Sequence, residues 1–133
     1  METVMARSAL PELNKTDFEV MKTLWKGGGR LSAREVHEGL HGHFGWAYST
    51  TRTTLERMVK KGLLQKNEFH GLNLYAPAVS KTAVLAARVR EFAESVLEME
   101  AAPVVSLFAD SDAVSADELA ELRRLVDETG EVE

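Results

Sequence analysis

The sequence contains no cysteine, and only three prolines, two tryptophans and two tyrosines occur among its 133 residues. Without cysteine there is no disulfide framework, no thiolate metal cluster and no cysteine nucleophile, which excludes disulfide-rich secreted scaffolds and cysteine-ligated zinc fingers. The composition suits a reducing compartment, and we expect a cytoplasmic protein. The N-terminal residues carry charges and no apolar stretch. We therefore expect neither a signal peptide nor a membrane-spanning segment.

The net charge of −5 conceals an uneven distribution along the chain. Residues 1–81 carry 12 Lys and Arg against 8 Asp and Glu, whereas residues 82–133 carry 4 against 13. A basic first part can approach a polyanion, while a strongly acidic second part favours contacts with protein or water. The alternative interpretation is an ordinary solvated surface on which the charges cluster by chance.

Apolar residues spaced three and four apart predict a first helix over about residues 15–26. Asn14 is a good N-cap for this helix. The glycines at positions 27–29 end it, because glycine loses much entropy in a helix and readily adopts the left-handed cap. Ser32 and Glu35 form a capping box, which predicts a short second helix that ends at about Leu40.

A third helix is predicted to begin near Tyr48 and to end at Gly62, with Leu55, Met58 and Val59 on its inner side. Two short segments with strand character follow, on either side of residues 69–71, and predict a β-hairpin with glycine at its turn. Three helices followed directly by a hairpin form a winged helix-turn-helix. The third helix of such a fold is the recognition helix.

Three further helices are predicted after Ser80. The first is long, and its apolar residues repeat at spacings of four and three, as in a coiled-coil seam. Pro103 suits the first turn of a second, short helix, and Ser115 with Glu118 forms a capping box for the third. The expected fold is mainly α with a small β-hairpin. It comprises a flexible lead-in (residues 1–12), a winged helix-turn-helix domain (13–79) and a helical dimerisation region (80–133).

The outer side of the third helix is short, polar and basic, which suits DNA. Arginine donates a bidentate pair to guanine, threonine offers a hydroxyl and a methyl group, and nearby lysines neutralise phosphates. An exposed, solvated helix is the alternative, and winged helices also bind proteins. The predicted DNA-binding residues are Ser49, Thr50, Arg52, Thr53, Arg57, Lys60, Lys61, Lys66 and His70.

These segments together resemble the penicillinase repressor family of BlaI and MecI type, which is related to the CopY copper repressors. The resemblance covers nearly the whole chain after about Glu12. It rests on the segments EVMKTLW (19–25), AREV (33–36), WAYSTTRT (46–53), RMVKKGLL (57–64), YAPAVS (75–80) and ELAEL (118–122).

The resemblance implies a homodimeric repressor that binds palindromic, double-stranded operator DNA through its third helix and dimerises through its C-terminal helices. Thr50, Thr53 and Arg57 match positions of the family pattern in that helix. Arg52 lies where the family varies, and we therefore expect it to set operator preference. A two-fold dimer would place two recognition helices about 34 to 36 Å apart, one turn of B-DNA.

The apolar faces after Ser80 support dimerisation independently, because a chain of this size does not leave so much hydrophobic surface in water. Packing of the same faces onto the winged domain is the alternative. The predicted dimerisation residues are Leu85, Val89, Phe92, Val96, Met99, Val104, Leu107, Phe108, Leu119, Leu122 and Val126.

The resemblance also implies routes by which the operator is released. In the beta-lactamase branch a membrane-bound sensor protease triggers cleavage of an Asn-Phe bond, and the matching pair here is Leu107-Phe108, with leucine in place of asparagine. Because the asparagine is missing, we favour a role of this pair in the interface core over cleavage. The copper branch uses C-terminal cysteines, which this chain lacks. His37, His41 and His43 offer imidazoles, but histidines in such a pattern more often form a polar helix end, and we expect no metal and no other cofactor.

An enzyme is the rival class to exclude first. Gly27–Gly29 follows a helix and lacks a subsequent Lys-Ser or Lys-Thr pair, so it is no phosphate-binding loop, and neither a nucleophile elbow nor a His-Glu-x-x-His motif occurs. We therefore expect no catalytic activity. A ligand-responsive winged-helix regulator and a winged helix that binds only protein stay open as alternative functions.

Overall fold

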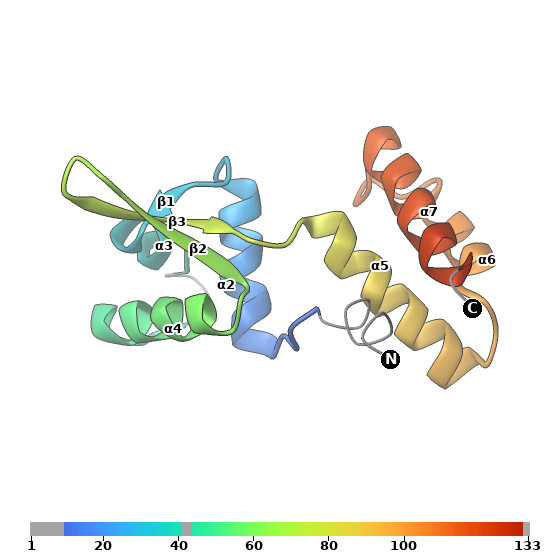
Figure 1. Ribbon diagram of the computed structural model, residues 1–133, viewed down its shortest axis with the longest axis horizontal. Coiled ribbons are helices and arrows are strands. Elements are labelled where there is room, and N and C mark those ends of the chain that lie inside the picture. Colours follow the sequence, from blue (N-terminus) through green and yellow to red (C-terminus); the bar gives the residue numbers. More distant parts are fainter. Residues whose placement is uncertain (1–9, 41–43, 132–133) are drawn as a thin grey trace. The chain divides into compact units, whose positions relative to one another are not determined.

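A computed structural model of the chain describes residues 10–40 and 44–131. The chain divides between Val79 and Ser80 into two compact units, of which the first comprises Pro11–Val79 (Figure 1). Most of the lead-in expected over residues 1–12 lies outside the described residues.

The first unit contains three helices and a small antiparallel sheet. The sheet order is β1-β3-β2, and Phe69 pairs with Leu72 next to the hairpin turn. This order of elements confirms the predicted winged helix-turn-helix, with β2, β3 and their turn as the wing (Figure 1). The elements are α2 (Lys15–Lys26), β1 (Leu31–Ser32), α3 (Ala33–Leu40), α4 (Tyr48–Lys60), β2 (Leu64–Phe69) and β3 (Leu72–Pro77).

The helix ends follow the predicted signals. Asn14 and Asp17 form a reciprocal capping box at the start of α2, and Ser32 and Glu35 form another at the start of α3. At the end of α4, Gly62 has φ +86°, its N–H donates to the Val59 carbonyl, and the next N–H donates to the Met58 carbonyl. This pair of hydrogen bonds is a Schellman motif, which needs the left-handed conformation that glycine adopts without strain.

The strand β1 was not predicted. It has two residues, Leu31 and Ser32, which pair with Tyr75 and Leu74 of β3. Two residues are too few to produce an alternating pattern, so that only the pairing with β3 reveals the strand. The hairpin itself is confirmed, with His70 (φ 53°) and Gly71 (φ 79°) both left-handed at its turn.

The core of the first unit is formed by side chains from all three helices and from the sheet. The predicted inner residues Leu55 and Met58 of α4 are fully buried, while Val59 is partly exposed. The other fully or almost fully buried apolar residues are Leu13, Val20, Met21, Leu24, Val36, Leu40, Leu63, Leu64 and Tyr75.

The carboxylate of Asp17 lies inside this core and is fully buried. Its oxygens accept hydrogen bonds from Arg57 (2.9 Å) and Lys61 (2.6 Å), in addition to the Asn14 amide (3.1 Å). Burial alone raises the pKa of Asp17, but the donors Lys61, Asn14 and Arg57 outweigh it and hold the pKa below its ordinary value. Asp17 therefore remains ionised and links the start of α2 to the end of α4.

The second unit is helical and has its own core. It contains α5 (Lys81–Phe92), a π-helical turn (Ala93–Leu97), α6 (Ala101–Val105), a 3₁₀ turn (Ser106–Phe108) and α7 (Ala116–Glu131). Ser115 and Glu118 form the predicted capping box of α7, and Lys81 pairs with Glu118 at 3.2 Å. The buried residues of this core are Ala86, Val89, Ala93, Ala101, Val104, Val105, Leu122 and Val126.

The prediction of one long helix after Ser80 is wrong in its length. The α-helical hydrogen bonds end at Phe92, a π-helical turn follows, and Glu98 adopts the left-handed conformation with φ 55°. Ala93, four residues after the buried Val89, lies in the core, while Phe92 and Val96 are exposed. A repeat of apolar residues carries no signal for such a turn. Pro103 lies in the first turn of α6, as predicted.

Replacement of Asp17 by asparagine is expected to destabilise the first unit. The new side-chain amide would still accept hydrogen bonds, but it would leave Arg57 and Lys61 without an anion, at a cost of about 2 kcal/mol at pH 7. Urea unfolding followed by tryptophan fluorescence measures this, because both tryptophans, Trp25 and Trp46, lie in the first unit.

The pH dependence gives an independent check of this charge. The native pKa of Asp17 is lowered, so its contribution is complete above the ordinary carboxyl value of 3.8 and is lost as the pH falls through the lowered pKa. The difference between Asp17→Asn and the unchanged protein should therefore shrink in that acid range. Glu68→Gln, at an exposed position of β2, serves as the control and should change little. A difference that persists unchanged into acid would contradict the ionised state of Asp17.

Candidate nucleic-acid interface

The first two turns of α4 present polar side chains to solvent. Thr51, Thr54 and Leu55 point into the unit and are buried, whereas the two residues before Thr51 and the two after it are exposed. The exposed set comprises four residues that were predicted to bind DNA, namely Ser49, Thr50, Arg52 and Thr53. Lys60, on the last turn, is exposed as well.

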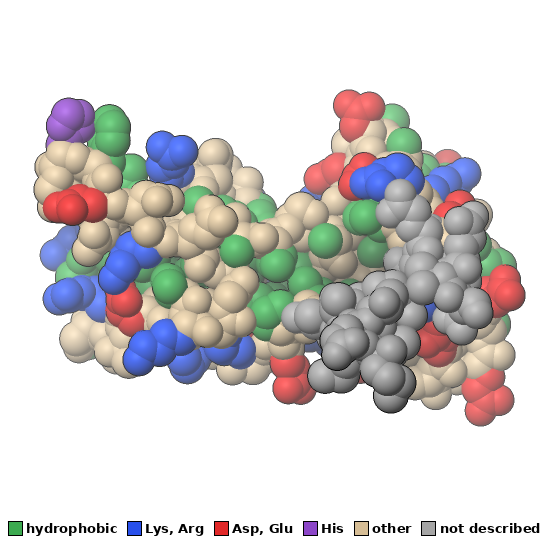
Figure 2. Space-filling view, in the orientation of Figure 1, with side chains coloured by type: hydrophobic (Ala, Val, Ile, Leu, Met, Phe, Trp, Pro, Cys, Tyr) green, Lys and Arg blue, Asp and Glu red, His purple; other side chains and the backbone are tan. Residues whose placement is uncertain are grey.

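A groove of about 480 Å³ lies between this side of α4, the start of α3 and the wing. Among the residues that line it are three cations, Arg34, Arg52 and Lys66, together with Tyr48 and one acidic residue, Glu56. We call this set the α4–wing groove. On the face shown in Figure 2, basic side chains gather over the first unit, while acidic side chains are more frequent over the second.

Arg34 is a component of the groove that was not predicted to bind DNA. Its guanidinium carbon lies 4.2 Å from the centre of the Tyr48 ring, a cation–π contact that orients the side chain. The edge of His37 packs on the same tyrosine, at 5.5 Å between ring centroids. Arg34 lies outside the recognition helix, on α3, so only the packing of α3 against α4 identifies it.

The start of α4 is held by a hydrogen-bond network around Thr51. The buried Thr51 hydroxyl accepts from Trp46 Nε1 at 2.9 Å and lies 2.7 Å from His37 Nδ1. Trp46 also stacks on Phe44, with ring centroids 4.4 Å apart. These contacts anchor the loop before α4, and they therefore help to fix the direction of the exposed residues that follow.

Two of the residues predicted to contact DNA form ion pairs with an acidic residue of the first unit. Arg57 and Lys61 both donate to the buried carboxylate of Asp17. Both cations were predicted to bind DNA, Arg57 from its place on the outer side of the third helix and Lys61 as a phosphate neutraliser. In the structure their charged groups stabilise the fold.

Lys66 is also paired. Its ammonium group donates to both carboxylate oxygens of Glu56, at 3.0 and 3.1 Å, and the Tyr75 hydroxyl donates to Glu56 Oε2 at 2.6 Å. The bonds from Tyr75 and Lys66 lower the pKa of Glu56, while burial and the bond to Glu56 raise the pKa of Tyr75. His70, at the wing tip, is exposed and packs edge-on against Phe69, at 4.3 Å between centroids.

The predicted dimerisation residues divide into two groups. Within the second unit Val89, Val104, Leu122 and Val126 are buried in the core, and Leu85, Phe108 and Leu119 pack partly buried against it. Within one chain α5, α6 and α7 cover one another, so that only part of these apolar faces is exposed. The residues that stay exposed are Phe92, Val96, Met99 and Leu107.

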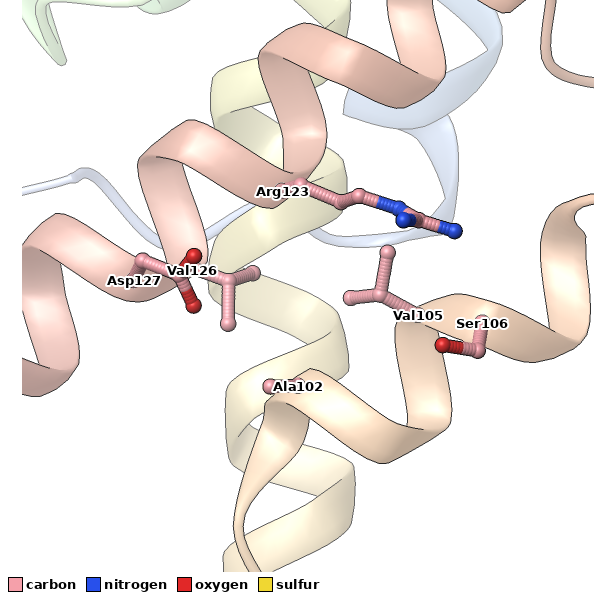
Figure 3. A pocket seen from close by; sticks show the side chains of 6 residues that line it. All are labelled: Ala102, Val105, Ser106, Arg123, Val126 and Asp127. Carbon is pink, nitrogen blue, oxygen red and sulfur yellow. The ribbon is translucent and has the colours of Figure 1, made fainter.

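A small pocket of about 190 Å³ lies on the second unit (Figure 3). Arg123 and Asp127 of α7 line it together with Val105 of α6. Its volume is below the roughly 300–1,000 Å³ of typical ligand sites. The remaining lining residues are Ala102, Ser106 and Val126.

The described residues contain no group of three or more side chains able to hold a metal ion. Of the three histidines considered as metal ligands, His41 and His43 lie outside the part of the chain that the structure describes, and only His37 lies within it. Among the helices of residues 10–40 and 44–131, none has the length and apolar character needed to span a membrane.

The family model of the penicillinase repressor matches residues 13–128. The chain belongs to the penicillinase repressor family. Three relatives agree with this assignment over most of their length. The penicillinase repressor of Bacillus licheniformis is 25% identical over 119 residues, covering 90% of this chain and 92% of the relative. The methicillin resistance regulatory protein MecI of Staphylococcus aureus is 24% identical over 115 residues, covering 86% and 93%.

The transcriptional regulator BlaI of Mycobacterium tuberculosis is 29% identical over 119 residues, covering 90% of this chain and 86% of the relative. Among solved structures, the solution structure of monomeric Bacillus licheniformis BlaI with the blaP half-operator is 28% identical, with a TM-score of 0.49 over 56% of this chain and 89% of that chain. As a member of the penicillinase repressor family, the protein is a DNA-binding transcriptional repressor and not an enzyme.

Replacement of Arg52 by alanine is expected to weaken operator binding and to relax its specificity. An arginine that reads a guanine contributes about 1 to 3 kcal/mol of discrimination. Fluorescence anisotropy with operator and scrambled duplexes measures the effect. Lys60→Ala is the matched comparison, since loss of a phosphate contact weakens both duplexes alike. If Arg52→Ala leaves the ratio of the two affinities unchanged, Arg52 does not read a base.

Proposed function

We propose that the protein represses transcription as a homodimer bound to a palindromic operator, with α4 in the major groove and the wing beside it. The observation that carries this proposal is the exposed run at the start of α4, where Arg52 and Thr53 lie next to the cation-lined α4–wing groove. Arginine and threonine in the major groove of DNA read base edges, whereas the exposed cations Arg34 and Lys60 contact phosphates. A protein that acts on operator DNA works in the cytoplasm.

Exposed apolar side chains on the second unit support the homodimer. Phe92, Val96 and Met99 are 49%, 62% and 41% exposed, and Leu107 is 79% exposed. So many large apolar side chains on a unit with its own closed core are typical of a protein interface. A second copy is the occupant we propose, because a palindromic operator requires two-fold symmetry in the protein that reads it.

The charge of the second unit agrees with this division of roles. The excess of acidic side chains after residue 81 is repelled by phosphates, so the second unit contacts protein and leaves DNA to the first. In this proposal α4 of each copy enters one of two successive major grooves, and the C-terminal helices set their separation.

For the pair Leu107 and Phe108 we favour a role in the dimer interface, with cleavage between them by a sensor-protease system as the alternative. The bond lies in a 3₁₀ turn, and Leu107 is the most exposed large apolar residue of the described chain. The residue before the cleaved bond would be leucine in this chain, where the beta-lactamase branch of the family has asparagine. A dimer that covers Leu107 would protect the bond, so proteolysis compared between monomeric and dimeric protein tests which role the pair has.

The proposed function is tested by anisotropy with duplex DNA from immediately upstream of the gene, beside a scrambled duplex, over a series of salt concentrations. We expect saturable binding that favours the native duplex and falls steeply with salt. Equal and weak binding to both duplexes leads to a selection from random duplexes. Failure of that selection to yield a preferred sequence would contradict specific DNA recognition and favour a winged helix that binds only protein.

The variant Phe92→Asp is expected to give monomers. A charge at this exposed apolar position must be desolvated in an interface but not in the isolated chain, which explains why the fold should survive. Operator affinity should fall steeply, because two linked halves bind far more tightly than one. Sedimentation velocity measures the oligomeric state, with Ala120→Asp as the control that adds the same charge at an exposed site of α7. An intact Phe92→Asp dimer would refute this interface.

A further inference from the structure

One carboxylate joins all three elements of the proposed DNA interface. Glu56 lies on α4, one turn after Arg52, and it accepts hydrogen bonds from Lys66 of β2 and from Tyr75 of β3. Lys66 and Tyr75 are directly opposite each other in the hairpin register. Glu56 therefore bridges a cross-strand pair and connects the recognition helix to both strands of the wing.

The Lys66–Glu56 ion pair lies at the surface, with 36% and 44% of the two side chains exposed, and such a pair alone contributes little. Its distinguishing feature is the third partner, the buried Tyr75. Tyr75 is only 4% exposed, and its hydroxyl donates to Glu56 at 2.6 Å. The buried ring thus fixes one carboxylate oxygen, and the ammonium group of Lys66 bridges both oxygens. The position of Glu56 is determined by the core of the unit, although the carboxylate borders the groove.

This arrangement engages a cation that would otherwise be available to phosphate. A DNA phosphate that approaches Lys66 meets an ammonium group whose charge is already balanced by the Glu56 carboxylate, so it gains less from the contact. Non-specific affinity depends on the number of phosphates that the protein neutralises, whereas specific affinity also depends on the geometry of base contacts. The pairing of Lys66 lowers the non-specific affinity for DNA. The attachment of the wing to α4 preserves the geometry of the base contacts.

We infer that Glu56 is a positioning residue that raises operator specificity. It withholds Lys66 from the phosphates, and through Tyr75 it keeps the wing at one distance from Arg52. Lys66 helps to hold the wing against α4 and does not neutralise a phosphate, which is the role expected from the sequence. The inference rests on the proposed function, because it requires that α4 and the wing contact DNA together.

Four proteins test the inference, namely the unchanged chain, Glu56→Ala, Lys66→Ala and the double variant. Anisotropy measures the affinity of each for the operator and for a scrambled duplex across a salt series. For Glu56→Ala we expect the salt slope to steepen by about 0.9, scrambled-duplex affinity to rise about threefold to tenfold, and discrimination to fall. Lys66→Ala alone should leave the slope unchanged, and in the double variant it should return the slope to its original value.

Two further variants separate charge from position. Glu68→Ala removes the same charge from an exposed site of β2. It reduces the general repulsion of DNA but leaves Lys66 paired, so the salt slope should remain unchanged. Glu56→Gln keeps an acceptor for Tyr75 without the charge, and it should retain more discrimination than Glu56→Ala. Tryptophan fluorescence in urea establishes that each variant is folded.

The outcomes distinguish the inference from the proposed function. If Lys66→Ala alone reduces the salt slope by about 0.9, Lys66 already contacts phosphate and the inference is overturned, while the DNA interface stands. The inference would also be overturned if Glu56→Ala lost its preference at a single base pair with an unchanged salt slope. That result would show that Glu56 itself reads a base. If neither these variants nor Arg52→Ala changes DNA binding, the interface itself is refuted.

Discussion

The buried carboxylate of Asp17 is the constraint on which the first unit depends. A charge inside a protein core must be paired and hydrogen-bonded, or the cost of its desolvation destabilises the fold. Asp17 meets this requirement locally through the Asn14 amide and at long range through Arg57 and Lys61. Since both cations come from the end of α4, the pairing holds this end against the start of α2. The opposite end of α4 can then face solvent.

The two ends of α4 consequently serve different purposes. The last turns supply cations to the fold, while the first turns carry the exposed Arg52 and its polar neighbours. Glu56, between them, connects the helix to the wing. Three of the cations predicted to bind DNA, Arg57, Lys61 and Lys66, are paired with acids of the same unit.

The second unit combines a closed core with an exposed apolar set. Small residues such as Ala86, Ala93 and Ala101 are buried in it, which allows the helices to approach closely. Val89 and Ala93 lie on the buried face at the end of α5, whereas Phe92 and Val96 lie on an exposed face. A repeat of apolar residues is thus divided between the core of the chain and a surface available to another molecule.

Much of the fold could be predicted from the sequence, since its signals act over three or four residues. The capping boxes at Asn14, Ser32 and Ser115, the Schellman glycine Gly62 and the turn glycine Gly71 set element ends through local hydrogen bonds and allowed φ values. Family membership followed as well, because it depends on the order of such segments. Only the tertiary structure decided which charged groups meet: Asp17 and Arg57 are 40 residues apart, and Glu56 and Tyr75 are 19 apart. The energy of an ion pair depends on how far its two groups are removed from water and on the distance between them. Both are set only when distant segments of the chain pack together.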